Sequence, residues 1–553
     1  MLDPTANKFS RRFSKIIVAA AVGLTLLAAG CGSSTKSATT NAAAETPTTP
    51  PATADVKQVT WGDGYGEPQS LDPAFSYNPP ENMVLANLCE SLLRIEPDLT
   101  IGTGLAQSYS HPSPDTWVYN LHPGVRFWDG APLTPADVVY SITRNLDPKL
   151  ASFWYVWAQN IASVRQTGPL QVTVTTKVPS LLTNEMLAAG LGEIIEARYA
   201  KAKGSTYGTP KGGVMCTGPF KLGAWNPGSN ITLIRNQSYW DHAHMARAAK
   251  FVLDFVTDDS TLTDGLLSGG LQGAYNVPPA AINRLAGSAN GTLYFGPSLR
   301  NYVLWPTAMT GPLANPLIRK ALSLAIDREG IANALFGGHA SPLLWAAPPD
   351  SFGYAKSVFE RAYAAVGVSP AADVSAAKKL VAQAGDPKGP IVIGAQAGDA
   401  ISLGMATDVA SEGQQIGLNV SVKLLPPAQF DNLYFDPKAR AGLNFFAATD
   451  SYYDVADPLE NVIEAATRGA QYNLIGYSNP VINRDVAEAL GVSNPERRAQ
   501  IVSQALTAWS DQYTFLPVVS APERLYMAKG ITGAPVSFTA DIYSPWAASV
   551  GAG

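Results

Sequence analysis

The chain is poor in cysteine, histidine and charge. Its 553 residues include three cysteines, five histidines and 15% charged side chains, and the net charge is −5. Binding to nucleic acid requires clustered Lys and Arg, and the sequence has no basic block, so nucleic acid is not expected as a partner. Only His242 and His244 are close together, without a third ligand nearby, and we interpret them as a solvated surface pair rather than a metal site.

Motifs that carry catalysis are also missing. The sequence contains no H-E-x-x-H, no G-x-S-x-G and no G-x-x-x-x-G-K-[ST]. Without a nucleophile and base, a metal set or a phosphate loop, we do not expect an enzyme, a cofactor or a catalytic metal.

The N-terminus reads as an export signal covering residues 1–30. Four basic residues lie within the first fifteen positions, and the stretch from Ile16 to Leu27 is apolar or small and uncharged. This stretch is too short to span a bilayer as a mature helix, which indicates a secretory signal peptide. The pair Arg11 and Arg12 leaves open whether export uses the general or the twin-arginine route.

Cys31 follows three small residues directly after the apolar stretch. The segment "LAAGC" resembles a bacterial lipobox, with Leu27 one step further from the cysteine than is usual. We expect Cys31 to become the lipid-modified N-terminus, because acyl chains anchor a protein to a membrane surface. The alternative is an ordinary secreted protein with a stray thiol.

Residues 31–55 are rich in Thr, Ala and Pro and have no apolar periodicity. Such a segment cannot recover its ordering entropy by burial, so we expect a disordered tether. About 500 residues remain for the folded part, enough for more than one lobe.

Cys89 and Cys216 are the other two cysteines. In an exported chain this pair favours a disulfide, whose loop of about 130 residues would stabilise the fold by about 5 kcal/mol in the chain-entropy model. Two buried free thiols are the alternative.

Local patterns predict a mixture of strands and helices. Residues 56–64 and 116–122 alternate as strands do, and "GPFKLGAW" and "NITLIRN" flank the turn at residues 226–229, as in a hairpin. A helix is expected to begin at Pro135, with Thr134 as its N-cap and Asp137 three residues after the cap. A second helix is expected over "DVSAAKKLVAQAG", with Asp373 as its cap. This mixture predicts α/β lobes.

Several long motifs, in order, resemble one family. "NLCESLLRIEPDLTIGTGLAQSYSHPSPDTWVYNLHPGVRFWDGAPLTPADVVYSITR" is similar to the signature stretch of the family 5 extracellular solute-binding proteins, the receptors of ABC importers for peptides, nickel and related solutes. The likeness continues through "CTGPFKLGAWNPG", "DGLLSGGLQGAYNVPP", "NPLIRKALSLAIDREGIANALFGGHASP" and "AAKKLVAQAG". It covers about nine tenths of the chain that would remain after signal removal.

The resemblance implies a two-lobed, type II periplasmic-binding-protein fold with a hinge and an interlobe cleft. Lobe I would comprise residues 56–297 and the return segment 518–553, with an extra subdomain at about 99–189, and lobe II would comprise residues 298–517. Such a receptor closes when its ligand contacts both lobes.

The resemblance also implies a ligand-binding aspartate. Peptide-binding members carry W-x-x-D-x-x-D-P in lobe II, and its first Asp pairs with the peptide ammonium. Aligning on Asp457-Pro458 places Asp454 at that position, although Ser451 replaces the family's Trp and Val455 follows the aspartate. The alternative role for Asp454 is a helix cap or loop anchor.

Further candidates for ligand contact follow from the same resemblance. In lobe II, Tyr452 and Tyr453 are candidate walls of the cleft, and Trp305 lies in the crossing segment "YVLWPT"; core packing is the alternative for all three. The lobe I candidates occupy positions where family members present groups to the ligand, and they are Tyr65, Gln69 and Glu90.

The function implied is a monomeric, lipid-anchored receptor outside the cytoplasm that delivers short peptides to an ABC permease. One alternative is the same role for another solute, such as an oligosaccharide that stacks on aromatic rings. Another, from a different class, is an envelope protein acting in adhesion or signalling without transport.

Overall fold

The computed structural model describes residues 45–553, apart from the side chain of Asp450. The expected signal peptide, Cys31 and residues 31–44 of the expected tether lie outside the described residues. Within residues 45–553, no helix combines the length and apolar composition that crossing a membrane requires.

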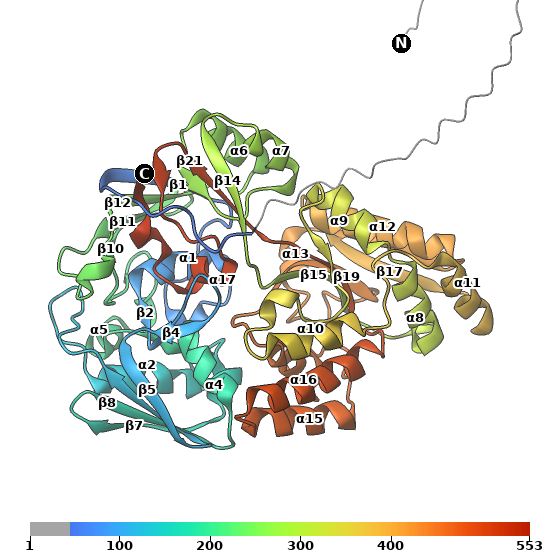
Figure 1. The fold of residues 1–553 in the computed structure, drawn as a ribbon, viewed down its shortest axis with the longest axis horizontal. Helices are drawn as coiled ribbons and strands as arrows, with labels where there is room; N and C mark the ends of the chain where they lie inside the picture. Colours follow the sequence, from blue (N-terminus) through green and yellow to red (C-terminus); the bar gives the residue numbers. More distant parts are fainter. Residues whose placement is uncertain (1–44) are drawn as a thin grey trace, which may run out of the picture. The chain divides into compact units, whose positions relative to one another are not determined.

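A seven-stranded mixed sheet forms the core of lobe I (Figure 1). Its centre is parallel, because β1 (Val56–Asp63) pairs in parallel with β12 (Ala248–Phe255). On the β12 side the sheet continues with β11 (Asn230–Arg235) and ends with β10 (Phe220–Asn226). On the β1 side it continues with β13 (Gly273–Ala274) and β21 (Glu523–Ala528) and ends with β14 (Gly291–Gly296). Because β21 belongs to this sheet, the C-terminal part of the chain returns to lobe I.

A six-stranded sheet forms the core of lobe II. Its order is β16 (Ser341–Pro342), β20 (Leu516–Ser520), β15 (Arg300–Pro306), β19 (Phe445–Tyr452), β17 (Pro390–Gln396) and β18 (Asn419–Leu425). Alternate residues of β15 enter different clusters, Val303 and Trp305 on one face and Tyr302 and Leu304 on the other. The sheet is therefore buried on both faces, as expected for apolar central strands.

The chain crosses between the two large sheets twice, once between β14 and β15 and once between β20 and β21. The boundary expected after residue 517 falls inside β20. A separate four-stranded antiparallel sheet lies within the range expected for the subdomain, in the order β5 (Ala106–Ser113), β6 (Thr116–Leu121), β8 (Gln171–Thr176) and β7 (Ile161–Gly168).

Short pairings and helices complete the fold (Figure 1). The two-stranded pairs are β2 (Glu90–Ser91) with β9 (Glu193–Ile194), β3 (Leu93–Ile95) with β4 (Ile101–Thr103), and β22 (Ile531–Thr532) with β23 (Gly551–Ala552). Helices of the lobe I segments are α1 (Pro79–Leu88), α2 (Pro135–Thr143), α3 (Tyr155–Ala158), α4 (Leu181–Glu185), α5 (Ala197–Lys203), α6 (Asp259–Ser268), α7 (Ile282–Ala286) and α17 (Phe538–Tyr543). Helices of lobe II are α8 (Pro316–Ala325), α9 (Arg328–Phe336), α10 (Lys356–Ala364), α11 (Val374–Gln383), α12 (Ala400–Gln415), α13 (Pro427–Asp431), α14 (Leu459–Asn461), the π-helical turn η10 (Val462–Ala466), α15 (Pro480–Gly491) and α16 (Pro495–Ser510).

The local patterns in the sequence predict these elements well. Helix α2 begins at Pro135, and Thr134 and Asp137 form the reciprocal capping box. Strands β10 and β11 pair as the expected hairpin, and α11 is capped by Asp373, whose carboxylate accepts a hydrogen bond from the Ala376 amide. Each of these elements was signalled by residues within a few positions of it.

The last part of the expected tether is ordered, contrary to the prediction. The Thr46 amide donates to the Phe295 carbonyl at 2.8 Å, and Ala54 forms a bridge with Ala552. Thr49 is buried and donates from its hydroxyl to the Ala534 carbonyl. Backbone hydrogen bonds to distant strands therefore hold this segment, and such pairing leaves no trace in local composition.

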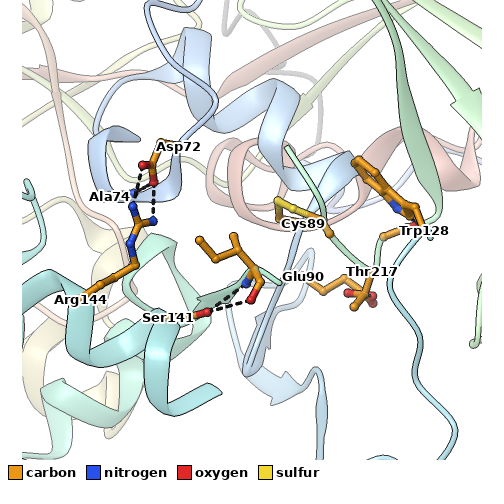
Figure 2. Close-up of a disulfide and its surroundings, with 11 residues drawn as sticks. Asp72, Ala74, Cys89, Glu90, Trp128, Ser141, Arg144 and Thr217 are labelled. Atoms are coloured by element: carbon orange, nitrogen blue, oxygen red, sulfur yellow. Dashed lines mark hydrogen bonds and ion pairs between the residues drawn. A yellow bond between two sulfur atoms is a disulfide. The ribbon is translucent and has the colours of Figure 1, made fainter. Parts of the chain in front are cut away.

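Cys89 and Cys216 form a disulfide in the structure (Figure 2). Both cysteines are buried within the main hydrophobic cluster of lobe I. The bond connects the end of α1 to the segment that leads into β10, so it fastens two parts of lobe I that are far apart in sequence.

Candidate ligand-binding site

A pocket of about 100 Å³ is lined by both lobes. Lobe I contributes Tyr77, Asn78 and Phe153. Lobe II contributes the larger share, which consists of Trp305, Tyr434, Phe435, Ser451, Tyr452, Asp454, Glu460, Asn461, Glu464 and Tyr472. A larger hollow of about 760 Å³ shares three of these lining residues, Tyr77, Phe153 and Phe435, and therefore adjoins the pocket.

The end of strand β19 positions the acidic part of the pocket. This strand ends at Tyr452, and the chain then turns through Asp454 toward α14 and η10. The Glu460 carboxylate accepts hydrogen bonds from the Asp454 amide at 2.8 Å and the Val455 amide at 3.1 Å. Glu460 therefore fixes the backbone that presents Asp454.

Asp454 is a buried carboxylate at the border between the lobes, with 7% of its surface exposed. It accepts a hydrogen bond from the hydroxyl of Tyr543, at the end of α17, which belongs to lobe I. Burial raises the pKa of Asp454 to about 6, and hydrogen bonds from Tyr543 and Glu460 act in the opposite direction. A nearby cation would favour the ionised form of this carboxyl group.

Two further carboxyl groups lie beside Asp454. Burial raises the pKa of Glu460 well above its usual value, and repulsion from Asp454 and Glu464 adds to this. Burial also raises the pKa of Glu464 well above its usual value, with a further contribution from Asp454. Among the described residues, none of those lining the pocket is Lys, Arg or His.

Aromatic rings form the lobe II wall. The Trp305 ring lies edge-on to Tyr434 at 5.4 Å and to Tyr472 at 6.1 Å, and the two tyrosine rings are 5.5 Å apart. Trp305 also donates from its indole nitrogen to the Tyr472 carbonyl at 3.3 Å. Edge-to-face packing of this kind gives the wall a fixed shape.

The lobe I wall consists of Tyr77 stacked on Phe153, with ring centroids 5.0 Å apart. The Tyr452 hydroxyl donates a hydrogen bond to the Tyr77 carbonyl at 2.8 Å, and Phe435 packs edge-on against the Tyr77 ring. Lobe II thus contacts the lobe I wall through both a polar and an aromatic interaction.

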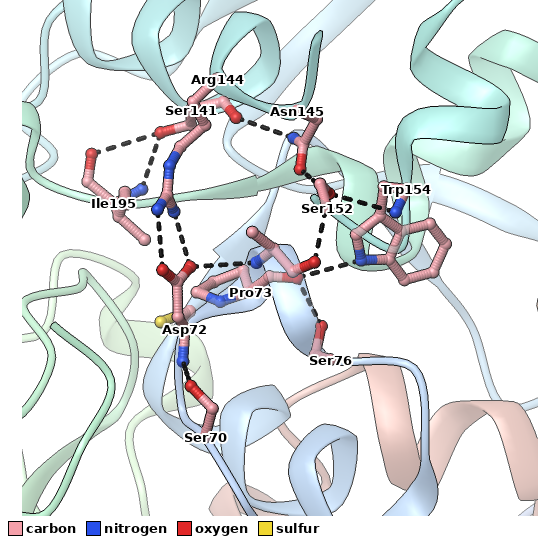
Figure 3. Close-up of polar contacts among 12 residues, drawn as sticks. Ser70, Asp72, Pro73, Ser76, Ser141, Arg144, Asn145, Ser152, Trp154 and Ile195 are labelled. Atoms are coloured by element: carbon pink, nitrogen blue, oxygen red, sulfur yellow. Dashed lines mark hydrogen bonds and ion pairs between the residues drawn. The ribbon is translucent and has the colours of Figure 1, made fainter. Parts of the chain in front are cut away.

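A buried polar network supports that wall (Figure 3). Arg144 donates two hydrogen bonds to Asp72, at 2.6 and 2.7 Å, and Asp72 also accepts from the Ala74 amide. The Phe153 amide donates to the Ala74 carbonyl at 2.9 Å, and the Trp154 indole donates to the Pro73 carbonyl at 3.0 Å. These bonds tie the segment before Tyr77 to the segment that contains Phe153.

Three of the residues expected from the sequence line the pocket, namely Asp454, Tyr452 and Trp305. Tyr453 does not, because it is buried in the core of lobe II and donates to the Ala346 carbonyl at 2.9 Å. Consecutive residues of an extended chain point to opposite sides, so Tyr452 and Tyr453 cannot both face the pocket.

The lobe I candidates also lie elsewhere. Glu90 is buried and accepts hydrogen bonds from Thr217, Tyr239 and Trp240, so it serves the packing beside the disulfide (Figure 2). Tyr65 packs against Arg300, and Gln69 is exposed and uses its backbone amide to bond Glu81. Neither lines the pocket.

Several pocket residues had escaped prediction. Glu460 and Glu464 are four positions apart just after Asp457-Pro458, a spacing that places two side chains close together on a helical segment beside Asp454. Tyr77 and Phe153 carry no local signal, since only the tertiary fold brings them to Tyr452. His242 and His244 lie in an exposed turn, and no metal-binding group of three or more His, Cys, Asp or Glu occurs in the described part of the chain.

Comparison with known families gives a match over residues 100–468 to the "Bacterial extracellular solute-binding proteins, family 5 Middle". This confirms the resemblance inferred from the motifs, and with it the interpretation as a solute-binding protein rather than an enzyme. A curated relative, the glutathione-binding protein GsiB of Salmonella paratyphi A, is 24% identical over 472 residues, which cover 84% of this chain and 89% of that protein.

Solved structures confirm the two-lobed fold. The ABC transporter-associated periplasmic binding protein DppA of Helicobacter pylori, solved with the peptide STSA, has a TM-score of 0.76 at 19% identity, and the match covers 90% of this chain and 98% of that chain. The binding protein AgaA of A. tumefaciens R10, solved with agropinic acid, has a TM-score of 0.76 at 21% identity, with 90% and 99% coverage.

Proposed function

Because the chain belongs to the family 5 bacterial extracellular solute-binding proteins, we propose that it captures short peptides in the pocket between its lobes and delivers them to an ABC permease. The lipid on Cys31 would hold the receptor at the outer face of the cell membrane. A monomer suffices for this role, since one chain supplies both walls of the pocket.

The observation that carries this proposal is the position of Asp454. Its carboxylate is buried, lines the pocket and lies beside Tyr543 of the opposite lobe. A charge-assisted hydrogen bond from a peptide ammonium to a carboxylate is stronger in such a water-poor site than at the surface. A ligand bound there would contact both lobes at once and so favour the closed state.

The larger hollow supports a ligand that extends beyond its amino group. It shares Tyr77, Phe153 and Phe435 with the pocket, and its volume of about 760 Å³ is in the range of small-molecule sites. Arg468 lines this hollow and is exposed, which suits a ligand whose far end carries a carboxylate. A peptide anchored at Asp454 would run toward it.

The names of the relatives allow other solutes. GsiB is named for glutathione, DppA was solved with a peptide and AgaA with agropinic acid. The same role for a non-peptide solute therefore stays the main alternative, and the aromatic wall of Trp305, Tyr434 and Tyr472 would serve an oligosaccharide.

The test is mass spectrometry of the small molecules that copurify with the full chain, followed by binding measurements on an Asp454→Asn variant. Peptides of mixed sequence, lost in the variant, would support the proposal. A single defined sugar or chelate would replace it, and so would peptide binding that Asp454→Asn leaves unchanged. The exposed Asp511→Asn is a matched control.

A further inference from the structure

The Glu464 side chain lines the pocket, whereas the Glu464 carbonyl serves the fold by accepting a hydrogen bond from the Tyr472 amide at 3.0 Å. Glu464 lies in the π-helical turn η10, a geometry often found at functional sites. Its side chain is partly buried and makes no hydrogen bond or ion pair within the described part of the chain. An ionised carboxylate in this setting does not stabilise the fold, because removing it from water without giving it a partner is unfavourable.

Three acidic residues line the pocket within the described part of the chain, and their contacts differ. Glu460 is almost fully buried and its two oxygens accept the amides of Asp454 and Val455. Among the described side chains, Asp454 and Glu464 are then the carboxylates left for a ligand, and no described basic side chain lines the pocket to compensate them. The exposed Arg468 lines the adjoining hollow instead. The negative charge of these carboxylates is therefore neutralised either by a cationic ligand or by bound protons.

The electrostatics of the pocket agree with this. Burial raises the pKa of all three acids, Asp454 raises that of Glu464 further, and hydrogen bonds with Tyr543 and Glu460 act in the opposite direction on Asp454. A cation would lower those pKa values, so binding a cation while these acids still hold protons would release protons.

We propose that Asp454 and Glu464 together bind a ligand end with two positive charges, so that the receptor prefers peptides beginning with lysine or arginine. The peptide part of this inference rests on the proposed function, whereas the charge part rests on the pocket alone. The α-ammonium would pair with Asp454 and the side-chain cation with Glu464.

The aromatic walls favour the same ligand. Seven of the lining residues are aromatic, namely Tyr77, Phe153, Trp305, Tyr434, Phe435, Tyr452 and Tyr472. The negative face of an aromatic ring attracts a cation, most strongly where water is excluded. A ligand with one positive charge would leave one carboxylate uncompensated, and a ligand end with a carboxylate would be repelled.

The experiment is calorimetric titration of the full chain and of its Glu464→Gln variant with two matched tripeptides, Lys-Gly-Gly and norleucyl-Gly-Gly. We expect the native chain to prefer the lysine peptide by about tenfold or more, as for close charge pairs at interfaces. In Glu464→Gln the preference should disappear through weaker binding of the lysine peptide alone. Glu464→Asp should restore it, and the exposed Glu360→Gln should have no effect.

Titration in two buffers of different ionisation enthalpy adds a second measurement. Proton release on binding the lysine peptide should be larger in the native chain than in Glu464→Gln. Agmatine, a dication without a peptide bond, and isoamylamine, its singly charged counterpart, test the charge rule without any peptide.

The outcomes separate the two proposals. Equal affinity for both tripeptides, or a lysine preference that survives Glu464→Gln, would overturn the inference and leave peptide transport standing. If neither tripeptide binds but agmatine binds through Glu464, the inference stands and the peptide function is wrong. If none of the four probes binds, both are overturned.

Discussion

The Tyr452 hydroxyl of lobe II donates a hydrogen bond of 2.8 Å to the Tyr77 carbonyl of lobe I, beside the pocket. The Tyr452 ring also packs edge-on against Phe538 of α17, with centroids 5.0 Å apart. One side chain from the end of β19 thus contacts two separate segments of lobe I. Since these contacts join the lobes beside the pocket, they stabilise this arrangement of the two lobes.

Removing that hydroxyl in Tyr452→Phe should weaken ligand binding by about fivefold, because a net hydrogen bond contributes about 1 kcal/mol. The loss should appear mainly as faster ligand dissociation, as is usual for changes at one interface. Stopped-flow dissociation of a copurified ligand measures this. The exposed Tyr109→Phe is the control, and an unchanged dissociation rate in Tyr452→Phe would contradict the role of this bond.

Reduction of the Cys89–Cys216 bond should lower the thermal midpoint of the full chain. The bond joins residues 127 positions apart, and the chain-entropy model gives about 5 kcal/mol for a loop of that size. Calorimetric melting with and without reductant, and of the double variant Cys89→Ala and Cys216→Ala, measures the effect. Cys31→Ala should melt as the native chain does. If reductant lowered the thermal midpoint of the native chain but not that of Cys31→Ala, the effect would come from Cys31, and the Cys89–Cys216 bond would not be structural.

Glu193 should make stability depend on pH. Its carboxylate is buried, one oxygen lacks a partner, and burial followed by repulsion from Asp72 raises its pKa to about 8. A raised pKa means that the folded state holds the proton more tightly, so the contribution is present below pH 4.5 and is lost as the pH rises through 8.

Glu193→Gln should therefore leave the free energy of unfolding unchanged near pH 4.5 and increase it by about 1 to 3 kcal/mol at pH 8.5. Urea unfolding at the two pH values measures the difference. The exposed Glu360→Gln should show no such pH dependence. An equal effect of Glu193→Gln at both pH values would mean that the carboxyl group does not titrate in this range.

The elements that the sequence predicted correctly depend on neighbours in the chain. Helix α2 follows from Thr134, Pro135 and Asp137, which satisfy the first amides of the helix within one turn. The segment 45–55 has no such local code, since its hydrogen bonds run to β14 and to the C-terminal strands. Its composition indicated disorder, because amino-acid composition carries no information about backbone hydrogen bonds to distant parts of the chain.

The site shows the same division. Asp454 could be located from the spacing to Asp457-Pro458, and Tyr452 lies beside it on the strand. Glu90 resembled a ligand group by position, yet three hydrogen bonds to Thr217, Tyr239 and Trp240 show it to be a buried structural acid. Whether a carboxylate faces a ligand or a core depends on donors that are more than a hundred residues away in the chain.

Arg144 should be the residue on which the lobe I wall depends most. It binds Asp72 through two hydrogen bonds, and its side chain is 13% exposed against 5% for Asp72. Arg144→Met would leave a buried carboxylate without its cation, at a cost of about 3 kcal/mol, whereas Arg144→Lys keeps the charge and loses the paired geometry. Both variants should weaken ligand binding, because Asp72 holds the segment that carries Tyr77 against Phe153. Urea unfolding and ligand titration measure the two effects.

Arg284→Met is the control for this prediction, since it removes an exposed pair with Asp264 and should change the free energy of unfolding by less than about 1 kcal/mol. If Arg144→Met were no more harmful than Arg284→Met, the network would not support the wall.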